Sequence, residues 1–161
     1  MKIGIISDTH GFLNDSIIEY FKGCGAIIHA GDITSQKLLD RLASIGSLYA
    51  VRGNCDRDPE LQLQTQLRFQ LEGLKCVAAH NCRDLPAHLE NYDLAVYGHT
   101  HKFSLSKEGS TVILNPGSAL LPRGGSREPT VVVLETGEGG GVLRKIEFAT
   151  GKETIFPLNE L

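Results

Sequence analysis

Three short apolar runs, separated by polar segments, dominate the first third of the chain. Lys2–Ile6, Ala26–Ala30 and Leu48–Val51 are nearly continuous in apolar residues, which is typical of strands buried on both faces. The two segments between them carry helix signals. Strand, helix, strand, helix, strand with short connections predicts right-handed βαβ units and a parallel sheet.

Two polar clusters predict where the intervening helices begin. Residues 14–16 open the first helix, and Ser16 and Glu19 have the spacing of a capping box. Residues 34–35 cap the second helix, which is expected to run to about Gly46. These two helices would cover the parallel strands.

The pattern changes in the middle of the chain. Residues 66–71 alternate between apolar and polar, and 74–79 return after a Glu72-Gly73 turn, which predicts a hairpin. A helix is predicted near Asp84–Asn91, with Asp84 as its cap and Pro86 in its first turn.

The second half is expected to be mostly antiparallel strands. The predicted strands are 94–97, 103–107, 111–114, 130–135 and 142–149. Residues 137–141 are predicted to form a glycine-rich hairpin turn. Residues 1–161 are therefore expected to form one α/β domain, with either two sheets or one strongly mixed sheet, covered by helices.

Composition narrows the class of protein. Apolar residues make up 41% of the 161 residues and charged residues 22%, as in ordinary globular domains. A net charge of −3 with dispersed basic residues disfavours nucleic acid as a partner. No apolar run approaches the roughly 18 residues of a membrane span, so no membrane partner is expected.

Two features predict a cytoplasmic location. Residues 1–4 enter a strand directly, without the apolar segment of a signal peptide. The four cysteines form no CxxC pair and no regular framework, which fits reduced thiols. They are Cys24, Cys55, Cys76 and Cys82.

Side chains able to bind metal follow five of the predicted strands. They are Asp8 and His10, then Asp32, Asn54 and His80, and finally His99 and His101. Loops beyond the carboxyl ends of strands meet at one crevice in open α/β sheets. Aspartate, histidine and asparagine without thiolate suit Mn, Fe, Zn or Mg, and a bridging aspartate suits two ions.

Each of these motifs has a simpler explanation when taken alone. Gly31-Asp32 and Gly53-Asn54 are common turn dipeptides, and a single histidine such as His80 is more often partly buried than a ligand. Their joint occurrence at five strand ends favours a metal site. His29 lies within a predicted strand and is assigned to the core or to support of the site. His88 is expected to be exposed on the predicted helix.

The order of the motifs resembles a known family. Asp8-x-His10, Gly31-Asp32, Gly53-Asn54, His80 and Gly98-His99-x-His101 together resemble the calcineurin-like metallophosphoesterase superfamily, in particular its small YfcE-type phosphodiesterase branch. The resemblance covers nearly the whole chain. It implies a four-layer αββα sandwich of two mixed β-sheets flanked by helices.

The resemblance also implies how two metal ions would be held. One ion would be bound by Asp8, His10, Asp32 and His101. The other would be bound by Asp32, Asn54, His80 and His99, so that Asp32 bridges. Mn²⁺ is the first choice of metal, with Ni²⁺, Fe²⁺, Zn²⁺ and Mg²⁺ as alternatives.

The chain departs from the fuller family pattern at two positions. Cys55 stands where many members have a histidine that protonates the leaving group, although the pair Cys55-Asp56 resembles the YfcE-type branch. Asp56 is expected to be a solvated loop carboxylate. Asn81 stands where a glycine commonly follows the metal-binding histidine. Residues 115–118 resemble a family loop and are expected to support the site at most.

Two functions follow from this reading. The complete ligand set favours a phosphodiesterase that cleaves a small phosphate diester by attack of metal-activated hydroxide, with Asp32, Asn54 and His99 as catalytic residues. The alternative is a non-catalytic or weakly catalytic interaction scaffold resembling the metallophosphoesterase-like subunit of retromer. Candidate phosphate contacts are Arg52, Arg57, Arg123 and Arg127. The sequence leaves homo-oligomerisation open.

Overall fold

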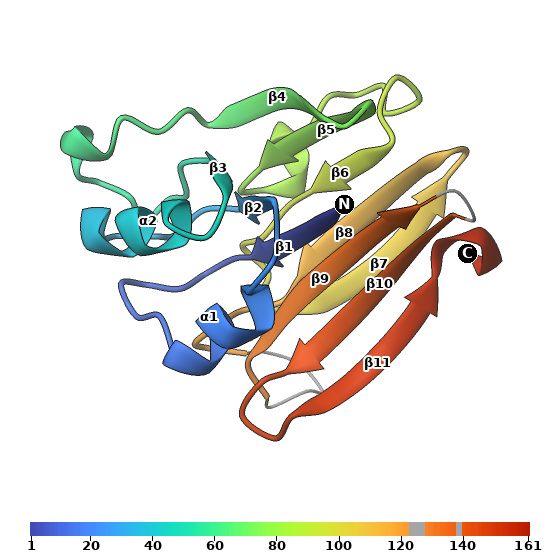
Figure 1. Cartoon of the computed structure of the whole chain (residues 1–161). Helices are drawn as coiled ribbons and strands as arrows, with labels where there is room; N and C mark the ends of the chain where they lie inside the picture. Colours follow the sequence, from blue (N-terminus) through green and yellow to red (C-terminus); the bar gives the residue numbers. More distant parts are fainter. Residues whose placement is uncertain (123–127, 138–139) are drawn as a thin grey trace.

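Two mixed β-sheets pack face to face in the computed structural model, which describes residues 1–122, 128–137 and 140–161 (Figure 1). The six-stranded sheet has the order β11 (Lys152–Pro157), β10 (Gly140–Glu147), β9 (Thr130–Gly137), β1 (Lys2–Ile6), β2 (Ala26–His29) and β3 (Ser47–Ala50). Strands β1, β2 and β3 are parallel, as predicted. Strand β9 joins β1 in antiparallel register, with Ile5 opposite Val132.

Strand β11 was not predicted from the sequence. It pairs with β10 at the edge of the six-stranded sheet, and none of its residues is buried. Ile155 is 60% exposed there. An edge strand with little buried surface leaves only a weak apolar pattern, which explains why the prediction missed it. The predicted turn at 137–141 includes residues 138–139, which lie outside the described residues.

The five-stranded sheet contains the middle of the chain. Its order is β4 (Gln66–Leu71), β5 (Leu74–Ala79), β6 (Leu94–Val96), β8 (Thr111–Pro116) and β7 (Phe103–Glu108). The predicted hairpin is confirmed as β4 and β5. Strand β6 lies parallel to both β5 and β8, while β7 returns antiparallel to β8. The predicted α/β sandwich of two mixed sheets is therefore confirmed.

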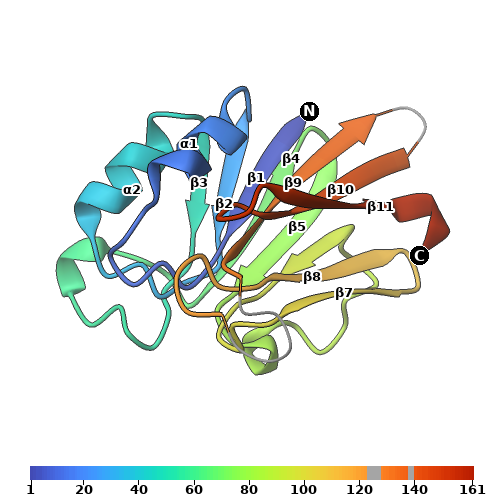
Figure 2. The ribbon, with the colours of Figure 1, turned by 90° about the horizontal axis from the view of Figure 1, so that it is seen from below.

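Helices α1 (Asp15–Phe21) and α2 (Gln36–Ala43) lie against the outer face of the six-stranded sheet (Figure 2). The predicted Ser16–Glu19 capping box is replaced by a cap at Asn14, whose Oδ1 accepts the backbone N–H of Ser16 at 2.9 Å. Ser35 caps α2, as predicted. No helix in the described residues combines the length and the apolarity needed to cross a membrane.

The prediction of a helix near residues 84–91 is wrong. The chain there forms only the short 3₁₀ helix η2 (Cys82–Asp84), and Leu85 is extended, with φ −69° and ψ 154°. Leu85 precedes Pro86, and the proline ring disfavours helical geometry in the residue before it. The hydroxyl of Thr111 lies 2.7 Å from the carbonyl oxygens of Leu89 and Tyr92, which holds this irregular segment against the five-stranded sheet.

The core between the sheets fixes their relative position. Ile3, Ile5 and Ile28 of one sheet belong to the same buried cluster as Val96 and Leu114 of the other. Burying such side chains supplies about 1.5–3 kcal/mol each. The loops that leave β1, β2, β3, β5 and β6 are thereby brought to one edge of the sandwich.

Candidate metal centre

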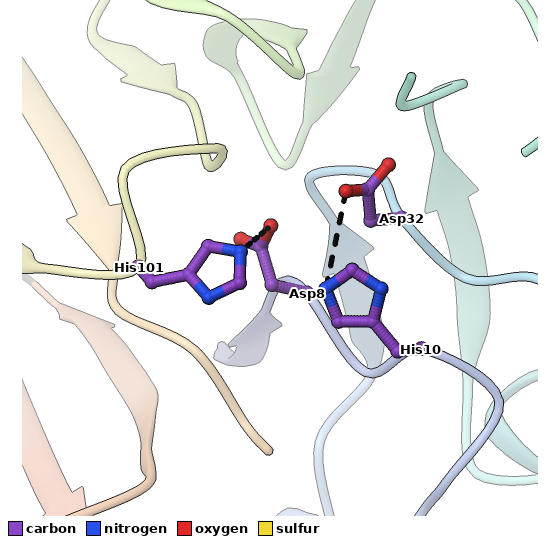
Figure 3. Close-up of side chains that lie close together, drawn as sticks. All are labelled: Asp8, His10, Asp32 and His101. Carbon is purple, nitrogen blue, oxygen red and sulfur yellow. Dashed lines mark ion pairs between the residues drawn. The ribbon is translucent and has the colours of Figure 1, made fainter. Parts of the chain in front are cut away.

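The loops after β1, β2, β3, β5 and β6 carry all seven predicted ligands. In one group, each residue offers a ligand atom within 4.8 Å of the others, and the side chains point toward a common centre (Figure 3). This group consists of Asp8, His10, Asp32 and His101. The side chains of Asn54, His80 and His99 lie beside Asp32 and form a second group.

The first group places nitrogen and oxygen atoms that can bind metal opposite one another. The Nδ1 atom of His101 donates to the carbonyl of Leu121 at 2.6 Å, so Nε2 of the neutral ring carries a lone pair. That Nε2 lies 3.1 Å from Oδ1 of Asp8. Asp8 Oδ1 and His10 Nε2 are buried without a hydrogen-bond partner among the described residues. Buried acceptors this close repel unless a positive charge stands with them, and a metal ion would supply it.

The second group also brings together atoms that can bind metal from different loops. The Nδ1 atom of His80 donates to the carbonyl of Ala30 at 2.7 Å, and its Nε2 faces Oδ1 of Asn54 at 3.1 Å and Oδ2 of Asp32 at 3.4 Å. The Nδ1 atom of His99 lies 3.1 Å from the same Asn54 oxygen. Metal–ligand bonds of about 2.1 Å at angles of about 90–109° place neighbouring ligand atoms roughly 3.0–3.4 Å apart. The spacing in the second group therefore fits a single ion.

Asp32 lies between the two groups. Its Oδ2 is 3.9 Å from Nε2 of His10 and 3.4 Å from Nε2 of His80. Its other oxygen, Oδ1, accepts the backbone N–H of Cys55 at 2.8 Å. One carboxylate is thus shared by both groups, which is the position that a bridging ligand requires.

The titration of these groups reflects the charge that the centre needs. Burial alone would raise the pKa of Asp32, but hydrogen bonds from His80 and from the Cys55 N–H outweigh it and hold that pKa below its ordinary value. Burial likewise opposes protonation of His80, but Asp32 and the Ala30 carbonyl raise its pKa overall. For Asp8, burial dominates and raises the pKa. In the metal-free chain a proton therefore tends to take the place of the cation.

The backbone at the ligands is strained. Five of the seven predicted ligands have positive φ angles between 46° and 67°: Asp8, His10, Asp32, His99 and His101. Residues other than glycine rarely adopt this conformation, which costs of order 1–3 kcal/mol each and clusters at functional sites. Periodicity in a sequence carries no signal for it.

Two glycines before the ligands allow the loops to approach one another. A Cβ on Gly53 would overlap Oδ1 and the backbone N of Asp32. A Cβ on Gly98 would overlap Oγ of Ser7 and lie 2.9 Å from Oδ2 of Asp8. The Gly-Asn and Gly-His dipeptides thus have a steric role at the centre itself, beyond that of ordinary turns.

The expectation that Asp56 is a solvated loop carboxylate is wrong. Asp56 is 2% exposed and accepts the backbone N–H groups of Ile33, Thr34 and Gly53, each at 2.7 Å. It ties the loop that carries Asp32 to the loop after β3. Because its oxygens accept backbone N–H groups, Asp56 holds together two loops that carry candidate ligands and is poorly placed to act as an acid. In the sequence it cannot be told apart from any other loop acid.

Residues 115–118 support the ligand loops, as expected. The Nδ2 atom of Asn115 donates to the carbonyl of Gly98 at 2.7 Å and to Oγ1 of Thr100 at 3.0 Å. The hydroxyl of Ser118 donates to the carbonyl of Asp8 at 3.0 Å. This loop therefore fixes the backbone on both sides of the first group.

Two histidines were assigned outside the site. His29 is fully buried in β2, where Nδ1 accepts the N–H of Gly31 at 3.2 Å and Nε2 lies 2.9 Å from Oγ1 of Thr9. Burial lowers the pKa of His29 to about 3, so the ring is neutral. The side chain of His88 is 82% exposed, as predicted, although not on a helix.

The candidate phosphate contacts are less clearly placed. Arg52 donates from Nε to the carbonyl of Leu63 and from Nη1 to that of Asp56, so its guanidinium holds the chain after β3. Arg57 is exposed. Arg123 and Arg127 lie outside the described residues. Asn81 has φ −101°, so no glycine is required there.

Comparison with known proteins places this geometry in a family. A protein-family model described as the calcineurin-like phosphoesterase superfamily domain matches residues 1–139 of the sequence. A probable metallophosphoesterase of Methanothermobacter thermautotrophicus is 31% identical over 149 residues, which cover 83% of this chain and 85% of that protein. Phosphodiesterase YfcE of Escherichia coli strain K12 is 30% identical over 154 residues, covering 78% and 83% respectively.

Solved structures agree at the level of the fold. The structure of E. coli YfcE, described as a phosphoesterase, has a TM-score of 0.78 at 26% identity and covers 99% of this chain and 100% of that one. Vps29 of Entamoeba histolytica, complexed with Zn²⁺, has the same TM-score of 0.78 at 18% identity, with 97% of each chain covered. At that identity the likeness to Vps29 concerns the fold alone.

Proposed function

The chain belongs to the calcineurin-like phosphoesterase superfamily, and on that premise we propose that it is a metal-dependent phosphodiesterase that hydrolyses a small phosphate diester. The observation that carries the proposal is the set of buried histidine nitrogens and carboxylate oxygens that converge around Asp32. Such a set is costly in an apo protein and is suited to divalent cations.

We assign two divalent ions to the centre. The first would be held by Asp8, His10, Asp32 and His101, and the second by Asp32, Asn54, His80 and His99. Mixed oxygen and nitrogen ligands without thiolate make Mn²⁺ the first choice. Ni²⁺, Fe²⁺, Zn²⁺ and Mg²⁺ remain alternatives that metal reconstitution would rank.

The chemistry divides between the ions and the chain. When bound, two such ions supply Lewis acidity, activate a water molecule near neutral pH and offset charge on the phosphoryl oxygens. Asp32 would fix the separation of the ions. Asn54 and His99 would hold the second ion, and His99, the more exposed of the two histidines in that group, would face an incoming diester.

Of the described residues next to the centre, neither Cys55 nor Asp56 is an efficient acid for the leaving group. Burial, followed by the neighbouring Asp32, raises the pKa of the Cys55 thiol. Asp56 is occupied by three backbone donors. Leaving groups of low pKa are therefore favoured, because they depart without a proton.

The proposal is tested by hydrolysis of bis-p-nitrophenyl phosphate with purified protein reconstituted with Mn²⁺. Asp32→Asn removes the shared carboxylate charge at nearly constant volume and serves as the inactive reference. His88→Ala, at an exposed position outside the centre, is the matched control. Release of p-nitrophenolate at the level of the Asp32→Asn protein would refute a diesterase.

The alternative is an interaction scaffold, suggested by the likeness in fold to Vps29. The fold cannot separate the two functions, since YfcE and Vps29 have the same TM-score of 0.78. The complete ligand set favours the enzyme. A metal-loaded protein that binds two ions but hydrolyses no diester or monoester would favour the scaffold.

A further inference from the structure

A crevice of about 210 Å³ lies between the loop that follows His10 and the start of helix α2. Gly11, Phe12 and Leu13 form one wall, while Lys37, Leu38 and Arg41 contribute to the other. None of these side chains belongs to the proposed ligand set.

The crevice adjoins the metal centre. The N–H of His10 donates to the carbonyl of Asp32 at 2.9 Å, and the N–H of Gly11 donates to that of Ile33 at 2.8 Å. The loops that carry two proposed ligands therefore run side by side as far as Gly11 and Ile33. The crevice opens immediately beyond that point, one residue past His10.

The walls of the crevice combine an apolar surface with positive charge at the rim. Phe12 is 54% exposed and is the aromatic member of the large apolar side chains exposed in the described residues. Leu13 and Leu38, which also line the crevice, are buried. Arg41 is held by the carboxylate of Asp15 and the carbonyl of Leu13. Lys37 is exposed and has no hydrogen bond or ion pair among the described residues.

The size of the crevice limits what it can hold. A cavity of about 150 Å³ lined by apolar side chains is sufficient for benzene. At about 210 Å³, the crevice has room for one ring with a small substituent. An aromatic side chain left half exposed beside a reactive centre is suited to stacking against such a ring.

We propose that this crevice binds one ester arm of the diester, namely an arm that carries a ring and, beyond it, an anionic group facing Lys37. The inference rests on the proposed phosphodiesterase function and names its substrate class. Phosphate would lie at the metal centre, with the ring against Phe12 and the second negative charge near the Lys37 ammonium.

The first test uses three diesters with the same leaving group, p-nitrophenolate. Their second arms are methyl, phenyl and 4-carboxyphenyl. The kcat/KM of the phenyl diester should exceed that of the methyl diester about tenfold, because part of the phenyl ring is removed from water when it enters the crevice. The carboxyl group should add a further factor of about three at low salt, and less at high salt.

Matched variants separate the two walls. Phe12→Ala should lower the phenyl-to-methyl ratio toward one, whereas Ile155→Ala, at an apolar residue 60% exposed on the distant β11, should not. Lys37→Gln should remove only the increment due to the carboxyl group. Lys22→Gln, at a lysine whose side chain is 80% exposed, is its control.

A variant on the other side of the centre tests whether the preference for the phenyl arm arises at the crevice or elsewhere. Leu121 is 53% exposed, and its carbonyl accepts the Nδ1–H of His101. If Leu121→Ala lowers the phenyl-to-methyl ratio and Phe12→Ala does not, the arm lies on that side and the crevice proposal is overturned. A ratio near one in the parent protein overturns it as well.

A binding measurement distinguishes failure of this inference from failure of the proposed function. Calorimetric titration of phenyl phosphate and methyl phosphate into the Mn²⁺-loaded protein should give a Kd about tenfold lower for the phenyl compound, and Phe12→Ala should abolish the difference. If no diester is hydrolysed, the proposed function fails, and the two Kd values still decide the crevice. Equal Kd values with active enzyme refute the crevice alone.

Discussion

Oδ2 of Asp32 lies 3.4 Å from Nε2 of His80, and burial leaves the pair little water to screen it. The carboxylate has a lowered pKa and the imidazole a raised one. Both shifts favour an ion pair in the metal-free chain, and a metal ion held by the two side chains would displace the proton. Metal binding should therefore release protons.

The shared carboxylate should be the least replaceable ligand. We expect Asp32→Ala to abolish both Mn²⁺ retention and diester hydrolysis, because it removes a ligand from both ions. Metal content measured by mass spectrometry and p-nitrophenolate release measure the two effects. His88→Ala should change neither by more than a small factor, since its side chain is 82% exposed. Comparable losses in the two proteins would contradict the proposed boundary of the centre.

Activity should depend steeply on the leaving group. Cys55 stands beside Asp32 with a raised pKa and is a poor acid at neutral pH. We expect rates to fall sharply from p-nitrophenolate to alkoxide leaving groups. Cys55→His should restore the poor leaving groups preferentially, within the roughly 10²–10⁴-fold range of general acid–base catalysis.

The comparison requires a series of aryl and alkyl diesters assayed on both proteins at equal metal occupancy. A shallow dependence in the parent would show that another acid is already present. Equal slowing of the Cys55→His protein on every substrate would point to a disturbed metal centre.

Acid should destabilise the protein through His29. The pKa of this ring is about 3 in the folded chain, against 6.5 ordinarily, because it is fully buried. Between these values the unfolded chain binds the proton and the folded chain does not. The contribution of His29 to the free energy of unfolding is therefore fully present above pH 6.5. Below that pH it falls by about 1.4 kcal/mol per pH unit, which amounts to about 2 kcal/mol at pH 5.

Urea unfolding at pH 7 and pH 5 tests this expectation. His29→Asn keeps an acceptor for the N–H of Gly31 and should lower stability at both values while reducing the loss between them. His88→Gln, at an exposed histidine, should lose as much as the parent. An unchanged loss in the His29→Asn protein would exclude this ring as the source.

Asp56 should matter more for stability than its place in a loop suggests. The two carboxylate oxygens of Asp56 accept three backbone N–H groups. Asp56→Asn replaces one of these oxygens with an amide group, which donates. We expect a loss of about 2–3 kcal/mol in the free energy of unfolding, with weaker metal retention. Asp15→Asn, whose side chain is 92% exposed, should cost less than about 1 kcal/mol. Equal costs would mean that the buried hydrogen bonds are dispensable.

The convergence of the seven candidate ligands could be predicted because it depends on features that a sequence displays. Strands buried on both faces appear as continuous apolar runs, and parallel strands end at the same edge of a sheet. Residues such as His80 and His99 could therefore be expected to meet, although 19 positions separate them. The order of the motifs supplied the grouping into two metal sites.

Other features depend on tertiary contacts that no local pattern reveals. Three N–H groups converge on the buried Asp56, and Asp8 and His99, which have positive φ angles, are joined by hydrogen bonds to distant loops. The false helix at 84–91 arose differently. Asp84 resembles a helix cap, but Pro86 disfavours helical geometry at Leu85, and the sequence contains both signals.

The split of the ligands between the two sheets has a mechanical consequence. Asp8, His10, Asp32 and Asn54 follow strands of the six-stranded sheet, whereas His80, His99 and His101 follow strands of the five-stranded one. Bound ions would therefore link the two sheets through metal–ligand bonds. These bonds would add to an interface of apolar side chains along which the sheets could otherwise slide. Any sliding of one sheet over the other would change the distances between ligands on the two sheets. The metal centre would therefore respond to such sliding before the strands separate.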